Sequence, residues 1–298
     1  MLVWLLTVML AAAGPRTVVK SQVKQEVWSF DVAFQRTRGK SEQVSFTVSR
    51  DAMERALKAP PVFPKKDAAR AGPKAINQLD VSPVRLEATA MSSGSVKMGA
   101  YGGTGAQRRR ALRRAEETWH DAQDVFARER GFFEVRKGQW APDHVADVVE
   151  AAPWLGDAAR ALSQGTRGPR DRAAKVLGLV QGIRYERSGP AKDKYRSPLA
   201  TLGKKKGDCD AKVALYLSLL RASDPSLETA VVYVKGHAFA ALALPPKPGD
   251  KVMRVDGQSW VVVEPVGPAA MPIGQAGRSS LRKVRVGWSR VRPVRSGG

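Results

Sequence analysis

A single cysteine, Cys209, is the residue of this chain best suited to nucleophilic chemistry. It lies in residues 207–220, GDCDAKVALYLSLL. This segment is rich in good helix formers, and the helix it predicts would be apolar on almost every face, which indicates burial. Asp208 suits the N-cap of that helix, which puts Cys209 in its first turn. Backbone N–H groups and the helix dipole stabilise a thiolate there, whereas the carboxylates of Asp208 and Asp210 raise the thiol pKa. Because a lone cysteine is more often a small buried hydrophobe, its partners decide its role.

A base and an acid for this cysteine stand at strand ends further along the chain. Residues 229–234 and 238–244 have the composition of strands, and His237 lies between them directly after a glycine. A third predicted strand, 260–263, ends at Glu264. Cysteine, histidine and carboxylate in this order can serve as nucleophile, base and orienter in acyl transfer. An imidazolium beside the thiol would then lower the thiol pKa.

Each of these assignments has a competitor. His237 could be an ordinary histidine at a strand end, and Glu264 a solvated acid before a proline. Asp256 is a second candidate for the orienting acid, but it precedes a glycine and so has the sequence of a turn residue. We prefer Glu264, because a strand end fixes the direction of its side chain, and keep Asp256 as the alternative orienter.

The order of these elements, a buried helix followed by antiparallel strands, predicts an α+β fold. Upstream, residues 23–34 and 43–48 alternate as strands do, and 107–130 and 144–162 have helical patterns, the second with a break at a proline. Prolines and glycines gather over 58–83 as in a linker. The predicted organisation is a signal peptide at 1–13, a small β element at 17–57, the linker at 58–83, a mostly helical region at 84–168, a catalytic domain at 169–277 and a basic C-terminal tail at 278–298.

The charge balance narrows the choice of partners. The chain has 298 residues, with 50 Lys and Arg against 28 Asp and Glu, a net charge of +22, and five arginines lie within 108–114. Such a surface attracts anions. No aromatic residues alternate with the basic runs, so we expect no specific nucleic acid. Anionic cell-envelope polymers are a candidate partner, against the simpler alternative that the basic surface is only solvated. His120, His144 and His237 are scattered and the cysteine is single, so we expect no metal, cofactor or intramolecular disulfide.

The first residues favour export. Residues 1–13, MLVWLLTVMLAAA, form an apolar run that ends in an A-x-A pattern, with a glycine and a proline after it. This is typical of a secretory signal, although no Lys or Arg precedes the run. The run is too short for a transmembrane anchor, which needs about 20 apolar residues. We therefore expect an exported protein, periplasmic or at the cell surface, with no transmembrane anchor.

The region 170–275 resembles the bacterial transglutaminase-like cysteine peptidase domains, because five blocks occur in the order and approximate spacing of that family. The blocks are LVQGIRY (179–185), YRSPLATL (195–202), KKKGDCDAKVALYLSLLRA (204–222), VVYVKGHAFAALALP (231–245) and WVVVEPVGPAAMPIG (260–274). The N-terminal half lies outside the resemblance. In the family an aspartate, or a glutamate in E-x-T, often stands where this chain has Glu264 in E-P-V.

The resemblance implies a papain/transglutaminase-like core, with a buried helix carrying the cysteine packed on an antiparallel sheet, and an N-terminal β and helical extension. It implies a triad of Cys209, His237 and Glu264, and Gln181 as an oxyanion donor, against the alternative that Gln181 is an ordinary polar helix residue. The enzyme would cleave amide bonds of a protein or peptide through a Cys209 thioester. Attack on the thioester by an amine would instead make it a crosslinking transglutaminase. A non-catalytic module of the same fold that binds anionic polymers is the remaining alternative.

Overall fold

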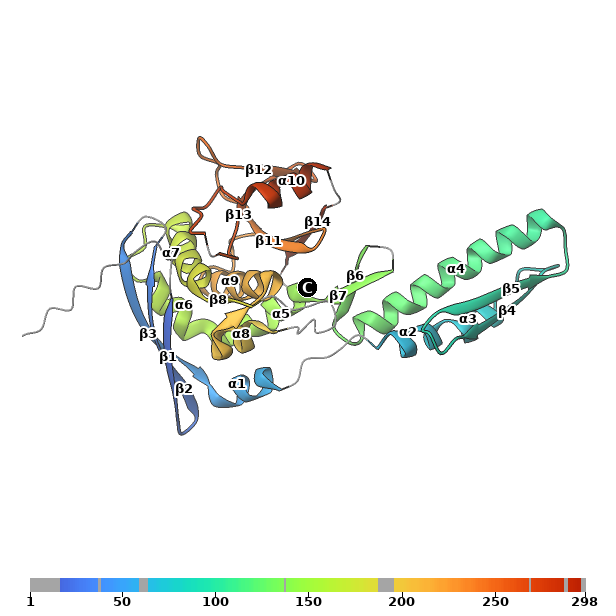
Figure 1. Cartoon of the computed structure of the whole chain (residues 1–298), viewed down its shortest axis with the longest axis horizontal. Helices are drawn as coiled ribbons and strands as arrows, with labels where there is room; N and C mark the ends of the chain where they lie inside the picture. Colours follow the sequence, from blue (N-terminus) through green and yellow to red (C-terminus); the bar gives the residue numbers. More distant parts are fainter. Residues whose placement is uncertain are drawn as a thin grey trace, which may run out of the picture. The chain divides into compact units, whose positions relative to one another are not determined.

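A computed structural model of the chain describes residues 17–36, 39–58, 64–136, 138–186, 196–267, 269–286 and 289–295. Its helices and largely antiparallel sheets form a mixed α+β structure, as the sequence predicts (Figure 1). The chain divides into two compact units: the first comprises residues 1–60 and 144–298, and the second comprises residues 61–143. The predicted signal peptide at 1–13 lies outside the described residues.

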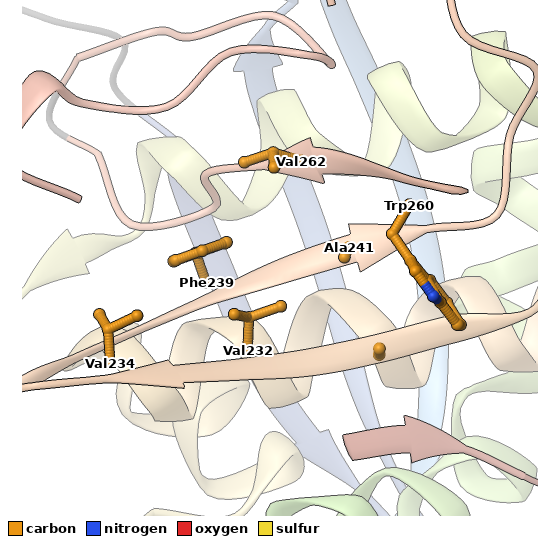
Figure 2. Close-up of a cluster of buried hydrophobic side chains, with 7 residues drawn as sticks. Val232, Val234, Phe239, Ala241, Trp260 and Val262 are labelled. Atoms are coloured by element: carbon orange, nitrogen blue, oxygen red, sulfur yellow. The ribbon is translucent and has the colours of Figure 1, made fainter. Parts of the chain in front are cut away.

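The first unit contains a five-stranded antiparallel sheet in the order β12-β13-β11-β10-β14. Its strands are β10 (Thr229–Val234), β11 (His237–Leu242), β12 (Val252–Val255), β13 (Gln258–Val263) and β14 (Ser289–Val294). Because side chains alternate between faces along a strand, Val232, Phe239 and Val262 gather in one buried cluster on one face of the sheet (Figure 2). Helix α10 (Arg278–Val286) packs Val284 against this cluster.

Helix α9 (Cys209–Ser223) runs through the core of this unit, and every residue from Ala211 to Leu220 is buried. The elements that pack against it include α5 (His144–Ala151), the 3-10 helix η1 (Ala152–Leu155), α6 (Gly156–Ser163), α7 (Pro169–Gly182), α8 (Pro198–Lys204) and β11. A short parallel pair, β8 (Arg184–Tyr185) with β9 (Lys206–Gly207), precedes it. The predicted buried helix is confirmed, and so is the helix break at the proline between α5 and α6.

A three-stranded antiparallel sheet confirms the predicted N-terminal β element. It consists of β1 (Val18–Lys24), β2 (Val27–Gln35) and β3 (Ser41–Ser49), with helix α1 (Arg50–Leu57) after it. Where one strand was predicted at 23–34, the chain turns at Gln25, with a φ of 48°, and forms β1 and β2. Thr17 Oγ1 donates to the carbonyl of Leu179 at 2.8 Å, and Arg36 pairs with Asp171 at 2.6 Å. These contacts with α7 make the element part of the first unit.

The second unit has secondary structure where a linker and a mostly helical region were predicted. Its elements are α2 (Lys65–Ala71), α3 (Pro73–Asn77), β4 (Arg85–Ala90), β5 (Val96–Tyr101), α4 (Gly105–Arg128), β6 (Phe132–Arg136) and β7 (Gln139–Pro142). Pro64 is the N-cap of α2 and Pro73 the first residue of α3, where a missing N–H costs no hydrogen bond. Pro64 and Pro73 therefore mark helix starts, and the described part of this interval, from residue 64 on, is structured and is not a linker. The helix predicted at 107–130 is confirmed as α4, which begins at a capping box of Thr104 and Gln107.

The C-terminal segment is not the tail that was predicted at 278–298. Helix α10 covers part of the large sheet, and β14 pairs with β10 from Ser289 to Val294. Val291 contacts the cluster of Figure 2 and Val294 is buried, so apolar residues spaced between the arginines make this basic segment an edge strand. The first unit therefore extends beyond residue 277, where the catalytic domain was predicted to end.

Candidate active site

Cys209 is the first residue of α9. Asp208 caps the helix, accepting a hydrogen bond from the Ala211 N–H at 3.3 Å. Gly207 allows the close approach of α8 just before the cap, because a Cβ there would lie 2.9 Å from Thr201 Cγ2. Cys209 remains partly exposed, although residues 211–220 of the helix are all buried. Asp208 is thus the N-cap and Cys209 lies in the first turn, as predicted, with its thiol at the boundary of the core.

The thiol lies beside the start of β11. A two-residue turn, with Gly236 at a φ of 64°, joins β10 to β11 and makes Val234 and His237 the first facing pair. In such a hairpin this pair exchanges hydrogen bonds, so the N–H of the next residue, Ala238, points away from β10. The pairing of β11 with β13 begins only at Ala240. The free N–H of Ala238 instead donates to the Cys209 sulfur and favours its thiolate.

The imidazole of His237 contacts Glu264, the acid at the end of β13. Nε2 of His237 lies 3.1 Å from Oε2 of Glu264, and the carboxylate is buried. Ser280 on α10 donates to the same oxygen at 2.9 Å. Asp256, the alternative orienter, occupies the turn between β12 and β13 with a φ of 50°. Of the two acids, the structure therefore brings Glu264 to the histidine.

Gln181 does not have the geometry of an oxyanion donor. Its side chain is buried, and its amide nitrogen donates to the carbonyls of Glu264 at 2.9 Å and Met271 at 2.8 Å. A primary amide has only two N–H groups, so none remains for a substrate oxyanion. Gln181 instead ties the end of α7 to the segment that follows β13. The oxyanion role suggested for this residue is therefore corrected to a structural one.

Lys212 is a buried cation that the sequence analysis passed over. It lies three residues after the cysteine on α9, and its Nζ donates to the carbonyls of Gln181 (3.1 Å), Ile183 (2.7 Å) and Val266 (2.7 Å). Burial lowers the pKa of Lys212 to about 7, against the opposing charge of Glu264. Three carbonyl acceptors use all three donors of an ammonium group. Lys212 thus fastens the segment after Glu264 to the helix that carries Cys209.

His144 is the second residue that the sequence analysis missed. From α5 its Nε2 reaches Oδ2 of Asp210 at 3.0 Å, and its Nδ1 lies 3.3 Å from Oδ2 of Asp147, an ion-pair distance with poor hydrogen-bond alignment. Its ring is buried and stacks on Tyr233 with centroids 6.4 Å apart. Burial disfavours the imidazolium, but the two carboxylates outweigh that cost and raise the pKa of His144 to about 10. In the sequence, only the spacing of His144 and Asp147, three residues apart in a predicted helix, signalled a polar cluster here.

In the resting structure, the environment of Cys209 favours the neutral thiol over the thiolate. Sγ of Cys209 lies 3.8 Å from Oδ1 of Asp210, and among the described residues it forms no hydrogen bond with His237. Burial raises the pKa of the thiol well above its usual range, the charge of Asp210 adds to this, and the N–H of Ala238 opposes it. The lowered thiol pKa that the sequence predicted is therefore wrong in direction for the resting structure. The physical reason is desolvation beside two carboxylates, which outweighs the helix start.

No protein-family model, curated protein or solved structure matches this chain. Within the described ranges, no group of three or more His, Cys, Asp or Glu side chains could hold a metal ion. In the same part of the chain, no helix is both long enough and apolar enough to cross a membrane.

Proposed function

We propose that this chain is a cysteine hydrolase of the transglutaminase-like class, a peptidase or amidase with a papain/transglutaminase-like core. The observation that carries the proposal is the bonded pair His237 and Glu264 at the start of β11, where the next N–H reaches the sulfur of Cys209. The Nδ1 atom of His237 has no hydrogen-bond partner among the described residues, so it is free to accept a proton. Nucleophile, base and orienter thus come from a helix start and two neighbouring strands.

The proposed reaction begins with the neutral thiol. As Sγ of Cys209 bonds to the amide carbon, its proton moves to Nδ1 of His237, and Glu264 stabilises the imidazolium that forms. The imidazolium then gives the proton to the leaving amine, the C–N bond breaks and a thioester remains. Water, deprotonated by His237, attacks the thioester and releases a carboxylic acid and the thiol. Proton transfer accompanies the attack, because the environment of the thiol raises its pKa.

The oxyanion formed during attack needs hydrogen-bond donors. The amide of Gln181 is occupied, and the Ala211 N–H already donates to Asp208. The proposed donor is therefore the N–H of Cys209, since the first N–H groups of a helix have no intrahelical partner. An amine that reached the thioester before water would form a crosslink, which is the transglutaminase alternative. Hydrolysis is the preferred outcome, because water is always available.

Export and contact with an anionic cell envelope belong to the same proposal. The apolar run at 1–13 with its A-x-A pattern supports secretion, and the net charge of +22 supports attraction to envelope polyanions. N-terminal sequencing of the mature protein tests the first point: a chain beginning near Gly14 supports export, and an intact Met1 on cytoplasmic protein contradicts it.

A second candidate function, a non-catalytic binding module, is favoured by one observation. The sulfur contacts Asp210 and not the imidazole, and the thiol pKa is raised, as expected for a cysteine that is part of the core. Such a module would keep its buried polar contacts for stability and bind anionic polymers through its basic surface.

A peptide carrying a C-terminal vinyl sulfone separates the two functions. Intact-mass spectrometry should find one adduct on the native chain and none on Cys209→Ala. On His237→Ala the adduct should form at least about 100-fold more slowly than on the native chain. His120→Ala, in the second unit, is the matched control and should label as the native chain does. Equal labelling of the native chain and His237→Ala would favour the binding module. Incorporation of a fluorescent primary amine into the thioester, at the expense of hydrolysis, would favour the transglutaminase.

A further inference from the structure

A groove lies between the edge strand β12 and helix α10, on the face of the sheet that carries the cluster of Figure 2. Its volume is about 670 Å³, within the range of cavities that accept ligands. The apolar lining comes from Val252, Met253 and Val262 on the strands and from Leu281 and Val284 on the helix. Val252, on the edge strand, is 39% exposed, so the β12 rim of the groove is open to solvent. An apolar side chain could therefore enter between helix and sheet.

Three cations complete the lining: Lys251 from the sheet side, and Arg278 and Arg282 one helical turn apart on α10. None of the three forms an ion pair within the described part of the chain. The nearest acids along the chain are already engaged, Asp250 with Arg170 at 2.5 Å and Glu264 with His237 and Ser280. Among the residues that the structure describes, no acidic side chain lines the groove. The groove thus combines an apolar floor with three positive charges that lack anionic partners.

We propose that this groove binds an acidic polypeptide segment that also carries apolar side chains, as a substrate-recognition site. The inference rests on the proposed hydrolase function and names the class of its substrate. Three separate cations suit a chain with several carboxylates better than an amphiphile with one anionic head group, and the floor accepts the apolar side chains between them. The partner is therefore a stretch of alternating acidic and apolar residues.

The groove is linked to the candidate active site through α10 and β13. Leu281 lines the groove, and its neighbour Ser280 donates to Oε2 of Glu264, the oxygen that contacts His237. Val262, on the floor, lies two residues before Glu264 on the same strand. A segment bound against α10 is thus held next to the carboxylate that orients the proposed base.

Binding can be measured without catalysis on the Cys209→Ala chain. The probe is a fluorescein-labelled synthetic peptide of alternating glutamate and valine, followed by fluorescence anisotropy. In this background, Arg278→Glu with Arg282→Glu should weaken binding about tenfold or more, because each charge reversal replaces attraction by repulsion at close range. Arg109→Glu with Arg113→Glu is the matched control, an i,i+4 arginine pair on the exposed side of α4 with the same change in net charge. It should change affinity less than about twofold.

Several outcomes would overturn the inference. Equal losses in the two charge-reversed pairs would show that the peptide binds only through net charge. If a peptide with glutamine in place of glutamate bound as tightly as the glutamate peptide, the three cations would play no part in recognition. Binding of phosphatidylglycerol vesicles that depends on Arg278 and Arg282, without peptide binding, would assign the groove to lipid. Arg278→Gln with Arg282→Gln, which introduces no repulsion, should still weaken binding about threefold or more, and its circular dichroism confirms that the fold is retained.

The test also separates this inference from the proposed function. Tight peptide binding by Cys209→Ala, together with no turnover by the native chain, would leave the groove as a binding site and remove the hydrolase. A different outcome is that the native chain turns over neutral and acidic peptides at the same kcat/KM, with no loss in the Arg278 and Arg282 variants. That result would support the hydrolase function and contradict the groove as its recognition site.

Discussion

Two histidines near Cys209, His237 on β11 and His144 on α5, lie in contrasting environments. His237, at the start of β11, keeps 15% of its side chain exposed and contacts the carboxylate of Glu264, and its Nδ1 has no partner among the residues that the structure describes. His144, on α5, is 1% exposed and lies between Asp147 and Asp210. Both are within the first unit. Both are connected by polar contacts to the first turn of α9: His144 bonds to Asp210, and the N–H of the residue after His237 donates to the sulfur of Cys209.

The difference separates a group that can exchange a proton from a fixed charge. The two carboxylates hold the pKa of His144 at about 10, so it is a permanent cation near neutral pH. In turn it holds the pKa of Asp210 well below its usual range, although burial opposes this. His144 thus offsets one of the two negative charges that flank the thiol. His237, which contacts one acid, is therefore the histidine that we propose as the base.

The largest expected effect is on activity, at His237. Replacing His237 by alanine removes the proposed proton acceptor, so kcat/KM on an amide substrate should fall about 1000-fold or more. The free energy of unfolding should change little, because the ring is partly exposed and has one polar partner. Urea denaturation and steady-state kinetics on the same preparation measure both. Native activity in this variant would contradict the role of His237 as the base.

His144→Gln should affect stability first. The substitution leaves Asp147 and Asp210 without their buried cation, and breaking a buried charge pair costs about 3–5 kcal/mol of unfolding free energy. His120→Gln, in the second unit, should change it by less than about 0.5 kcal/mol. Urea titration at pH 7 measures both variants. If His144→Gln were as stable as His120→Gln, the charged network around α9 would contribute nothing.

The pH dependence of stability distinguishes a fixed cation from a titrating one. The folded pKa of His144, about 10, exceeds its unfolded value, so its contribution is complete below pH ~6.5 and is lost as pH rises towards 10. Lys212 has a folded pKa of about 7, below its unfolded value. Its charge therefore costs stability below pH ~7, and this cost is lost as pH rises to about 10.5. The stability difference between the native chain and His144→Gln, which cancels Lys212, should therefore shrink above pH 7. A difference that stays constant from pH 6 to 10 would contradict the raised pKa.

A smaller effect is expected on the thiol itself. The alkylation rate of Cys209 should titrate above the ~8.5 of a free thiol, because burial and two carboxylates surround it. Asp208→Asn keeps an N-cap acceptor and removes one charge, so the thiol pKa should fall by up to about one unit. Iodoacetamide labelling across pH measures this. An apparent pKa well below 8.5 in the native chain would mean that an imidazolium of His237 already holds the thiolate at rest.

The smallest effect is expected at Ser280. Ser280→Ala removes one of two hydrogen bonds to Oε2 of Glu264, so kcat should fall about three- to tenfold with KM nearly unchanged. Ser280→Thr keeps the hydroxyl and should restore most of the rate. A change in KM alone would show that α10 acts on substrate binding and not on the orientation of His237.

The sequence by itself determined what depends on near neighbours along the chain. The capped helix α9, the alternating strands β2 and β3, the strands β10, β11 and β13, and the turn at Asp256 were predicted from spacing and composition. These patterns rest on contacts between residues two to four apart, which any segment displays in its own sequence. The choice of Glu264 over Asp256 belongs to the same class, because a strand end and a turn are local features.

Only the tertiary structure decided which distant groups meet. His144 reaches Asp210 across 66 residues, Ser280 reaches Glu264 from a segment predicted to be a tail, and the amide of Gln181 is consumed by two carbonyls. The direction of the thiol pKa was wrong for the same reason. Desolvation and through-space charge depend on what packs around Cys209, and no pattern along the chain records that packing.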